Sequence, residues 1–217
     1  MARRRKGRDV QGVILLDKPQ GLSSNQALQR VKWLFNANKA GHTGNLDPMA
    51  TGMLPLCFGH ATRVSAFLLD ADKSYRATVK LGERTDTADA DGEIVETASV
   101  PSIDIADLQR VAEQFTGPQQ QIPPMYSALK HEGQRLYKLA RAGEEVERPP
   151  RDITIYGIDD LALTDDGFRC TVSCSKGTYI RTLAEDMAKA LGTIGHLTAL
   201  RRETVGSFDA NLPLVSI

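Results

Sequence analysis

Hydrophobic and polar residues follow two different periods along this chain, and these periods predict helices and strands in an irregular order. Apolar residues at i, i+3, i+4 and i+7 predict a helix that ends near Asn36, and Ser23-Ser24-Asn25 offers its N-caps. Strict alternation predicts a strand at 74–81. The other expected elements are strands at 12–16, 152–163 and 168–174, helices at 61–69 and 105–115, a helix from the N-cap Thr178 through Leu191, and an apolar run at 197–200. The mixture fits an α+β domain better than a regular βαβ array.

Composition places the chain among ordinary globular proteins. Of its 217 residues, 41% are hydrophobic and 25% are charged, with a formal net charge of zero. No apolar run approaches the roughly 20 residues of a membrane span. The basic residues at 3–8 are not followed by an apolar segment, so they are not a secretory signal. Residues 1–9 are expected to form a basic tail, either solvated or in contact with phosphate.

The cysteines and histidines argue against a metal site. The small, odd set Cys57, Cys170 and Cys174 favours a reducing compartment, which predicts a cytoplasmic protein. No second Cys/His pair stands at zinc spacing, so the cysteines are expected to be buried small hydrophobes. The acidic loop at 84–92 is similar to a calcium loop, but Thr87 and Ala98 stand where two ligands belong.

The composition of the segment Gly41–Gly52 predicts a loop with a defined backbone conformation that carries one carboxylate, that of Asp47. Gly41 and Gly44 can take positive φ, while Pro48 fixes its own φ and pushes Asp47 toward an extended conformation. A P-loop is excluded because Gly52 is not followed by Lys, and the glycine spacing does not match a dinucleotide fingerprint. The pattern is compatible with a plain turn or with a rigidly held nucleophile.

Residues 119–151 differ in composition from their surroundings. Tyrosines and basic side chains are interspersed there between Pro123-Pro124 and Pro149-Pro150. Two interpretations stay open, a surface excursion that grips nucleic acid and a plain strand-and-helix insertion.

Several motifs in a fixed order carry a resemblance to a known family. They lie at 12–19, 41–52, 73–76 with 84–89, 121–130 and 175–181. The chain resembles the TruB family of bacterial tRNA pseudouridine synthases, which modify the T-loop uridine at position 55. The resemblance implies an α+β catalytic domain at 10–217, with a mixed, largely antiparallel sheet, helices packed on it and a central catalytic cleft. It also implies that the insertion near 119–151 embraces the T-arm of tRNA.

The resemblance assigns a role to each of seven residues. Asp47 matches the essential aspartate, Tyr75 the tyrosine that stacks on the target uracil, and Arg181 the arginine paired with the catalytic carboxylate. The substrate-binding positions are His42, Tyr179, Leu200 and Asp89. The chain departs from the family pattern at Asn45, where a small residue is usual, and at His60, where Glu is common. The C-terminal PUA domain of the family is not expected within these 217 residues.

The implied reaction can be carried out with a single carboxylate. Isomerising uridine to pseudouridine breaks the N1–C1′ bond and makes a C5–C1′ bond without gain or loss of atoms, so no redox cofactor or metal is expected. A carboxylate can attack C1′, as in retaining glycosidases, or C6 of the base. The expected partner is the T-arm stem-loop of tRNA, and nothing demands more than a monomer. The alternative is a non-catalytic module that binds and folds the T-arm.

Overall fold

The computed structural model describes residues 7–217, and they form two compact units. Unit 1 contains the described residues up to Arg76 together with Leu200–Ile217, and unit 2 contains Ala77–Ala199. Of the tail expected at 1–9, residues 1–6 lie outside the described part. Arg8 is described, and its backbone bonds to Asn36 and Asn38 in unit 1. None of the helices in residues 7–217 is long and apolar enough to cross a membrane.

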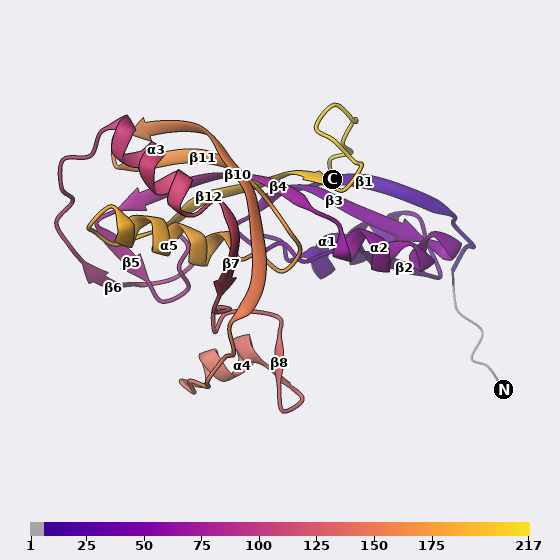
Figure 1. The fold of residues 1–217 in the computed structure, drawn as a ribbon. Coiled ribbons are helices and arrows are strands. Elements are labelled where there is room, and N and C mark those ends of the chain that lie inside the picture. Colours follow the sequence, from indigo (N-terminus) through magenta and orange to yellow (C-terminus); the bar gives the residue numbers. More distant parts are fainter. Residues whose placement is uncertain (1–6) are drawn as a thin grey trace. The chain divides into compact units, whose positions relative to one another are not determined.

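Unit 1 is a mixed sheet with helices packed on it (Figure 1). Its elements are β1 (Gly12–Lys18), α1 (Ser24–Leu34), β2 (Ala40–His42), β3 (Thr51–Phe58), the 3-10 helix η1 (Gly59–Arg63), α2 (Ser65–Asp70), and parts of β4 (Lys73–Leu81) and β12 (Gly195–Val205). β1 and β2 both pair with β3 in the antiparallel direction, whereas β12 pairs with β3 in parallel. The apolar face of α1 is buried through Ala27, Leu28 and Val31.

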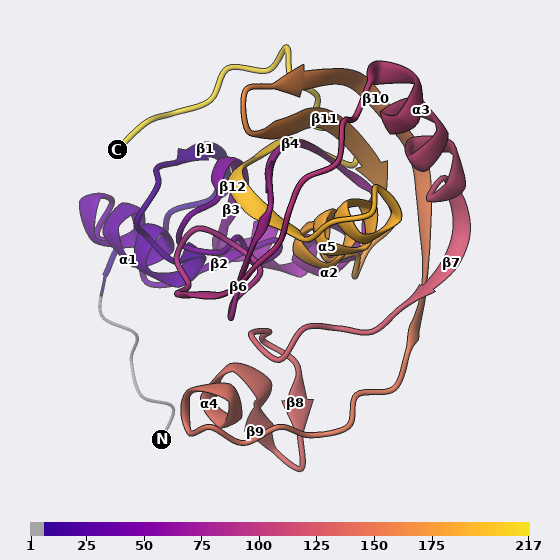
Figure 2. The ribbon, with the colours of Figure 1, turned by 90° about the vertical axis from the view of Figure 1, so that its left-hand side faces the viewer.

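Unit 2 is built around the long hairpin of β10 and β11. Its elements are β5 (Glu83–Thr85), β6 (Ile94–Thr97), α3 (Ile105–Gln114), β7 (Gly117–Gln121), β8 (Lys130–His131), β9 (Gln134–Arg135), α4 (Leu136–Arg141), β10 (Arg151–Thr164), β11 (Gly167–Cys174), α5 (Ile180–Ala190), and the rest of β4 and β12. Both β7 and β11 pair with β10 in the antiparallel direction. The β8–β9 hairpin and α4 stand apart from α3 and α5, joined to them through β7 and β10 (Figure 2).

These elements confirm the α+β class and the mixed, largely antiparallel sheet, while the central cleft stays a prediction. The first helix begins after the predicted N-cap Ser23, which forms a capping box with Gln26. The strand expected at 74–81 is β4, with alternating buried and more exposed residues. Cys57, Cys170 and Cys174 are all buried, as expected.

Two local predictions were wrong in detail, and one expected run belongs to a longer element. The amphipathic helix expected at 61–69 is divided at Val64 into η1 and α2, and α2 has no buried residue. Tyr179, not Thr178, is the N-cap of α5, because the Thr178 hydroxyl bonds to the Ser175 carbonyl instead. The run expected at 197–200 is part of the longer strand β12, which also includes Arg201 and Arg202.

Candidate active site

The loop between β2 and β3 holds the backbone on both sides of Asp47. Before it, the Leu46 amide donates to Ser24 Oγ at 2.7 Å, and Ser24 Oγ donates back to the Leu46 carbonyl at 3.2 Å. After it, the Pro48 carbonyl accepts from the Gly21 amide at 2.8 Å and from Lys18 Nζ at 3.4 Å. The Asp47 side chain is half-buried. These anchors fix the backbone that carries the carboxylate and so restrict where its side chain can lie.

Glycine is required at two positions of this loop, although not at both of the expected ones. Gly44 has φ +125° and Gly52 has φ +97°, whereas Gly41 lies in β2 without positive φ. A Cβ at Gly52 would overlap the backbone carbonyl oxygen of Arg202, and one at Gly41 would meet nothing within 4 Å. Gly52 is therefore needed both for its conformation and for the close approach of β12 to β3.

His42 lies at the end of β2 in an environment that favours the neutral imidazole. Burial lowers the pKa of His42, the nearby Arg202 charge lowers it further, and the Gly44 backbone only partly offsets these effects. Its Nδ1 atom is buried without a hydrogen bond in the described part of the chain. A neutral ring can stack against a base without the desolvation cost of a charge.

Tyr75 and Leu200 belong to unit 1 and are each 8% exposed. The neighbours of Tyr75 along β4 bind β12: the Ser74 amide donates to Thr204 Oγ1 at 3.1 Å, and Arg76 pairs with Glu203 at 3.2 Å. Because successive side chains of a strand point to opposite faces, Tyr75 lies on the other face from these two residues. The ring is thus fixed on the buried face of β4.

Arg181 forms a buried polar cluster in unit 2. Its side chain and that of Asp89 are each 5% exposed, and Arg181 Nη1 lies 3.5 Å from Asp89 Oδ2. Arg181 also donates to the Thr87 carbonyl at 2.8 Å and to the Tyr126 carbonyl at 2.7 Å. Asp89 Oδ1 accepts from the Thr87 hydroxyl at 2.6 Å and from the Asp91 amide at 3.1 Å. The cluster joins α5, the acidic loop and the start of the 119–151 insertion.

Tyr179 precedes Arg181 and is held through its backbone. Its amide donates to Gln121 Oε1 at 2.8 Å, and its carbonyl accepts from Gln121 Nε2 at 3.1 Å. Gln121 was not among the predicted site residues, although it begins the matching stretch at 121–130. One side-chain amide therefore connects the end of β7 to the start of α5.

The predicted site residues divide between the two units. His42, Asp47, Tyr75 and Leu200 belong to unit 1, and Asp89, Tyr179 and Arg181 belong to unit 2. The structure brings Asp89 and Arg181 into direct contact. The predicted pairing of Arg181 with Asp47 stays a prediction.

Lys18 and Arg202 are two buried cations of unit 1 that sequence reasoning did not assign to the site. Lys18 is fully buried and donates to the Leu22 carbonyl at 2.6 Å and the Pro19 carbonyl at 2.9 Å. Arg202 is 1% exposed, so it does not form part of a basic surface, although it follows another arginine, Arg201, in the chain. Only their positions beside the Gly41–Gly52 loop identify them, and the sequence separations are too large for a local pattern to show this.

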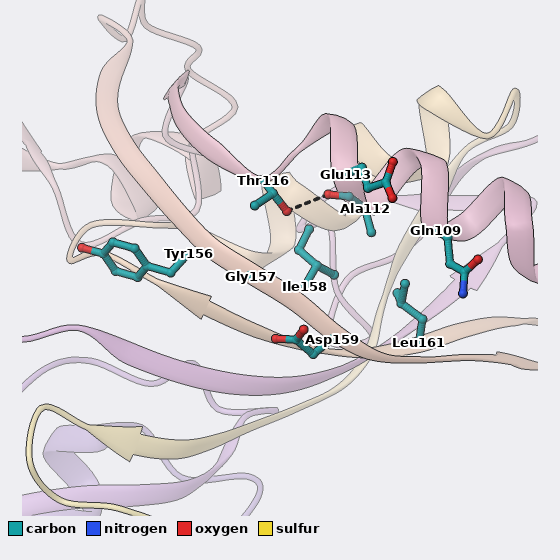
Figure 3. A pocket seen from close by; sticks show the side chains of 9 residues that line it. All are labelled: Gln109, Ala112, Glu113, Thr116, Tyr156, Gly157, Ile158, Asp159 and Leu161. Carbon is teal, nitrogen blue, oxygen red and sulfur yellow. Dashed lines mark hydrogen bonds between the residues drawn. The ribbon is translucent and has the colours of Figure 1, made fainter.

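A surface groove of about 700 Å³ lies between α3 and β10 in unit 2 (Figure 3). Its lining residues are Gln109, Ala112, Glu113, Thr116, Tyr156, Gly157, Ile158, Asp159 and Leu161. None of the predicted site residues lines it. Among the described residues there is also no cluster of His, Cys, Asp and Glu that could hold a metal ion.

Comparison with known proteins identifies the family. Residues 32–180 match the model of the TruB family pseudouridylate synthase N-terminal domain, and residues 181–216 match that of the tRNA pseudouridylate synthase B C-terminal domain. The chain belongs to the TruB family. The family match includes all seven predicted site residues, since 42–179 fall in the first region and 181 and 200 in the second.

Over the aligned regions, curated TruB relatives are more than half identical to this chain. It is 60% identical over 204 residues to tRNA pseudouridine synthase B of Psychrobacter cryohalolentis, covering 92% of this chain and 57% of that protein. It is 57% identical over 211 residues to the protein of the same name from Chromohalobacter salexigens, covering 97% of this chain and 69% of that protein. The chain thus spans between about half and two thirds of the length of these relatives.

Solved structures show the same fold. A chain in the crystal structure of a Cbf5-Nop10-Gar1 complex aligns with TM-score 0.74 and 30% identity, covering 95% of this chain and 52% of that chain. A chain in the structure of an H/ACA RNP bound to a substrate RNA containing 2′-deoxyuridine aligns with TM-score 0.70 and 27% identity, covering all of this chain and 57% of that chain.

Proposed function

We propose that this chain isomerises the T-loop uridine of tRNA, at position 55, to pseudouridine, with Asp47 as the nucleophile. The observation that carries the proposal is the loop on which Asp47 stands. Ser24 holds Leu46, and Gly21 and Lys18 hold Pro48, so the backbone that carries the carboxylate is held on both sides. A binding module has no need for such a rigidly held acid. Membership of the TruB family and the name of the curated relatives support the same reaction.

The reaction balances with the residues of the chain alone. The Asp47 carboxylate bonds to C1′ as the N1–C1′ bond breaks and its electron pair leaves with uracil. The base turns, C5 displaces the carboxylate from C1′, the C5 proton departs, and N1 takes up a proton. In the alternative route the carboxylate bonds to C6, the N1–C1′ bond breaks and C5 bonds to C1′. The Asp47–C6 bond then breaks as the C5 proton departs, and N1 takes up a proton, which gives the same product. Tyr75 offers a ring to stack on the uracil and a hydroxyl for proton movement at C5.

RNA is the proposed partner because a related structure contains a bound substrate RNA. The target uridine must leave its stack, which costs a few kcal/mol, and the neutral ring of His42 is proposed to fill its place. Leu200 and Tyr179 are proposed to enclose the base, while Arg181, held by Asp89, is proposed to keep the nucleophile charged. The T-arm is proposed to contact the 119–151 insertion, where Arg141 lies 5.8 Å from the centre of the Tyr137 ring. The chain is further proposed to act as a monomer in the cytoplasm.

Tritium release from a T-arm stem-loop carrying one C5-labelled uridine tests this function. The native chain should release tritium, and Asp47→Asn should release none while binding the stem-loop with unchanged affinity. Asp209→Asn, at an exposed acid of unit 1, is the matched control and should behave as the native chain. Binding without release by the native chain would favour the non-catalytic module instead. A hairpin of unrelated sequence should be neither bound tightly nor modified if the T-arm is the substrate.

A further inference from the structure

Arg202 is the largest side chain that the fold buries completely. It extends from β12, and its backbone stands opposite Gly52 of β3 in the parallel register. At 1% exposure its guanidinium cannot contact a large solvent-borne ligand such as RNA. Any effect of Arg202 on a reaction must therefore be transmitted through the protein.

The guanidinium contacts both ends of the loop that carries Asp47. Arg202 Nε donates to the Met53 carbonyl at 2.7 Å, after the loop, and Nη1 lies 3.5 Å from the Asn45 carbonyl, before Asp47. A Cβ placed at Gly44 would lie 3.4 Å from Nη1, so the guanidinium also lies in van der Waals range of the backbone at Gly44. The Arg202 guanidinium thus contacts the chain on both sides of Asp47, at Asn45 and at Met53.

Burial of this charge is not explained by an ion pair. In the described part of the chain Arg202 has no salt bridge to a carboxylate, and its Nη2 is buried without an acceptor. Taking a cation out of water without a charged partner is unfavourable. A stability role alone would be served as well by an apolar side chain of similar volume, so the guanidinium geometry points to another requirement.

We propose that Arg202 is a positioning residue that holds the two ends of the Asp47 loop and thereby sets the place of the carboxylate. The inference rests on the proposed function, since Arg202 acts on the reaction only through Asp47. Lysine is a poor substitute, because one ammonium group cannot reproduce two donors fixed in one plane. Displacing a catalytic group by about 1 Å costs on the order of 100-fold in rate.

Kinetics of Arg202→Met and Arg202→Lys test the proposal in the full chain. We expect kcat on the T-arm stem-loop to fall about 100-fold in Arg202→Met, with KM changed less than about twofold, and partial recovery in Arg202→Lys. Arg201→Met is the matched control, because Arg201 is adjacent in β12 but forms a partly exposed pair with Asp17 at 2.9 Å. It should keep the native kcat. Native kcat in a folded Arg202→Met protein would overturn the proposal.

Two measurements without RNA separate this proposal from the proposed function. Amide hydrogen exchange at Leu46 and Ala50 should accelerate in Arg202→Met, and the His42 pKa, followed by NMR, should rise toward 6.5 as the neighbouring charge is lost. If the native chain forms no pseudouridine, the proposed function fails, and unchanged exchange in the variant would overturn the positioning role independently. If Arg202→Met does not fold, the same kinetics and hydrogen exchange are measured on Arg202→Lys. Native kcat together with native exchange in Arg202→Lys would then overturn the proposal.

Discussion

Removing the Asp89 carboxylate should destabilise unit 2 far more than removing an exposed acid of the same loop. Asp89 lies 3.5 Å from Arg181 with both side chains 5% exposed, and it also accepts bonds from Thr87 and Asp91. Breaking a buried ion pair by removal of one partner costs about 3–5 kcal/mol, because the other charge stays buried. We therefore expect Asp89→Ala to lower the free energy of unfolding by about 3–5 kcal/mol. The exposed Arg84–Glu96 pair should contribute less than about 1 kcal/mol.

A double-mutant cycle in urea, followed by circular dichroism, measures this coupling directly. Asp89→Ala, Arg181→Met and the double variant should be strongly non-additive, so that the second substitution costs much less than the first. Asp89→Asn should be intermediate, since its amide oxygen can still accept from the Thr87 hydroxyl. Asp91→Ala is the control, because the Asp91 side chain is exposed. Equal losses for Asp89→Ala and Asp91→Ala, or full additivity in the cycle, would refute the reasoning.

Three further predictions concern conformation and titration. Gly52→Ala should lower stability by more than the roughly 1–3 kcal/mol of a left-handed residue, because its Cβ would also overlap Arg202, and Gly41→Ala should be nearly neutral; urea midpoints of both variants check this. Because the pKa of His42 is lowered in the fold, the unfolded chain takes up that proton first. Stability should thus fall as pH drops below about 6.5, and His42→Gln should weaken this dependence in midpoints measured at several pH values. Burial raises the pKa of Cys170 to about 12, so brief alkylation at pH 8 followed by peptide mapping should leave Cys170 unmodified until the protein unfolds.

Elements with strong local signals could be predicted from the sequence. The alternation at 74–81 and the strands expected at 152–163 and 168–174 depend on neighbouring residues only, and all three match the structure within one residue at each end. The helix predicted at 61–69 was wrong because its apolar side chains, such as Phe67 at 78% exposure, are not buried by the fold. Helical periodicity predicts a buried face only where a partner surface exists, and α2 buries none of its residues.

In the candidate site, the residues selected from motifs could be predicted, but the residues that contact them from distant parts of the sequence could not. Motif order was enough to select Asp47 and Arg181, but it could not show what holds them. The anchors of Asp47 are Lys18, Ser24 and Arg202, which are 30 residues from Pro48, 22 from Leu46 and 157 from Asn45 along the chain. In the sequence Arg202 looks like half of a basic surface pair, and only the parallel pairing of β12 with β3 turns it inward beneath the loop. Candidates for residues that act on a substrate can thus be proposed from local motifs, whereas the residues that hold the backbone around them depend on contacts made only when the sheet has formed.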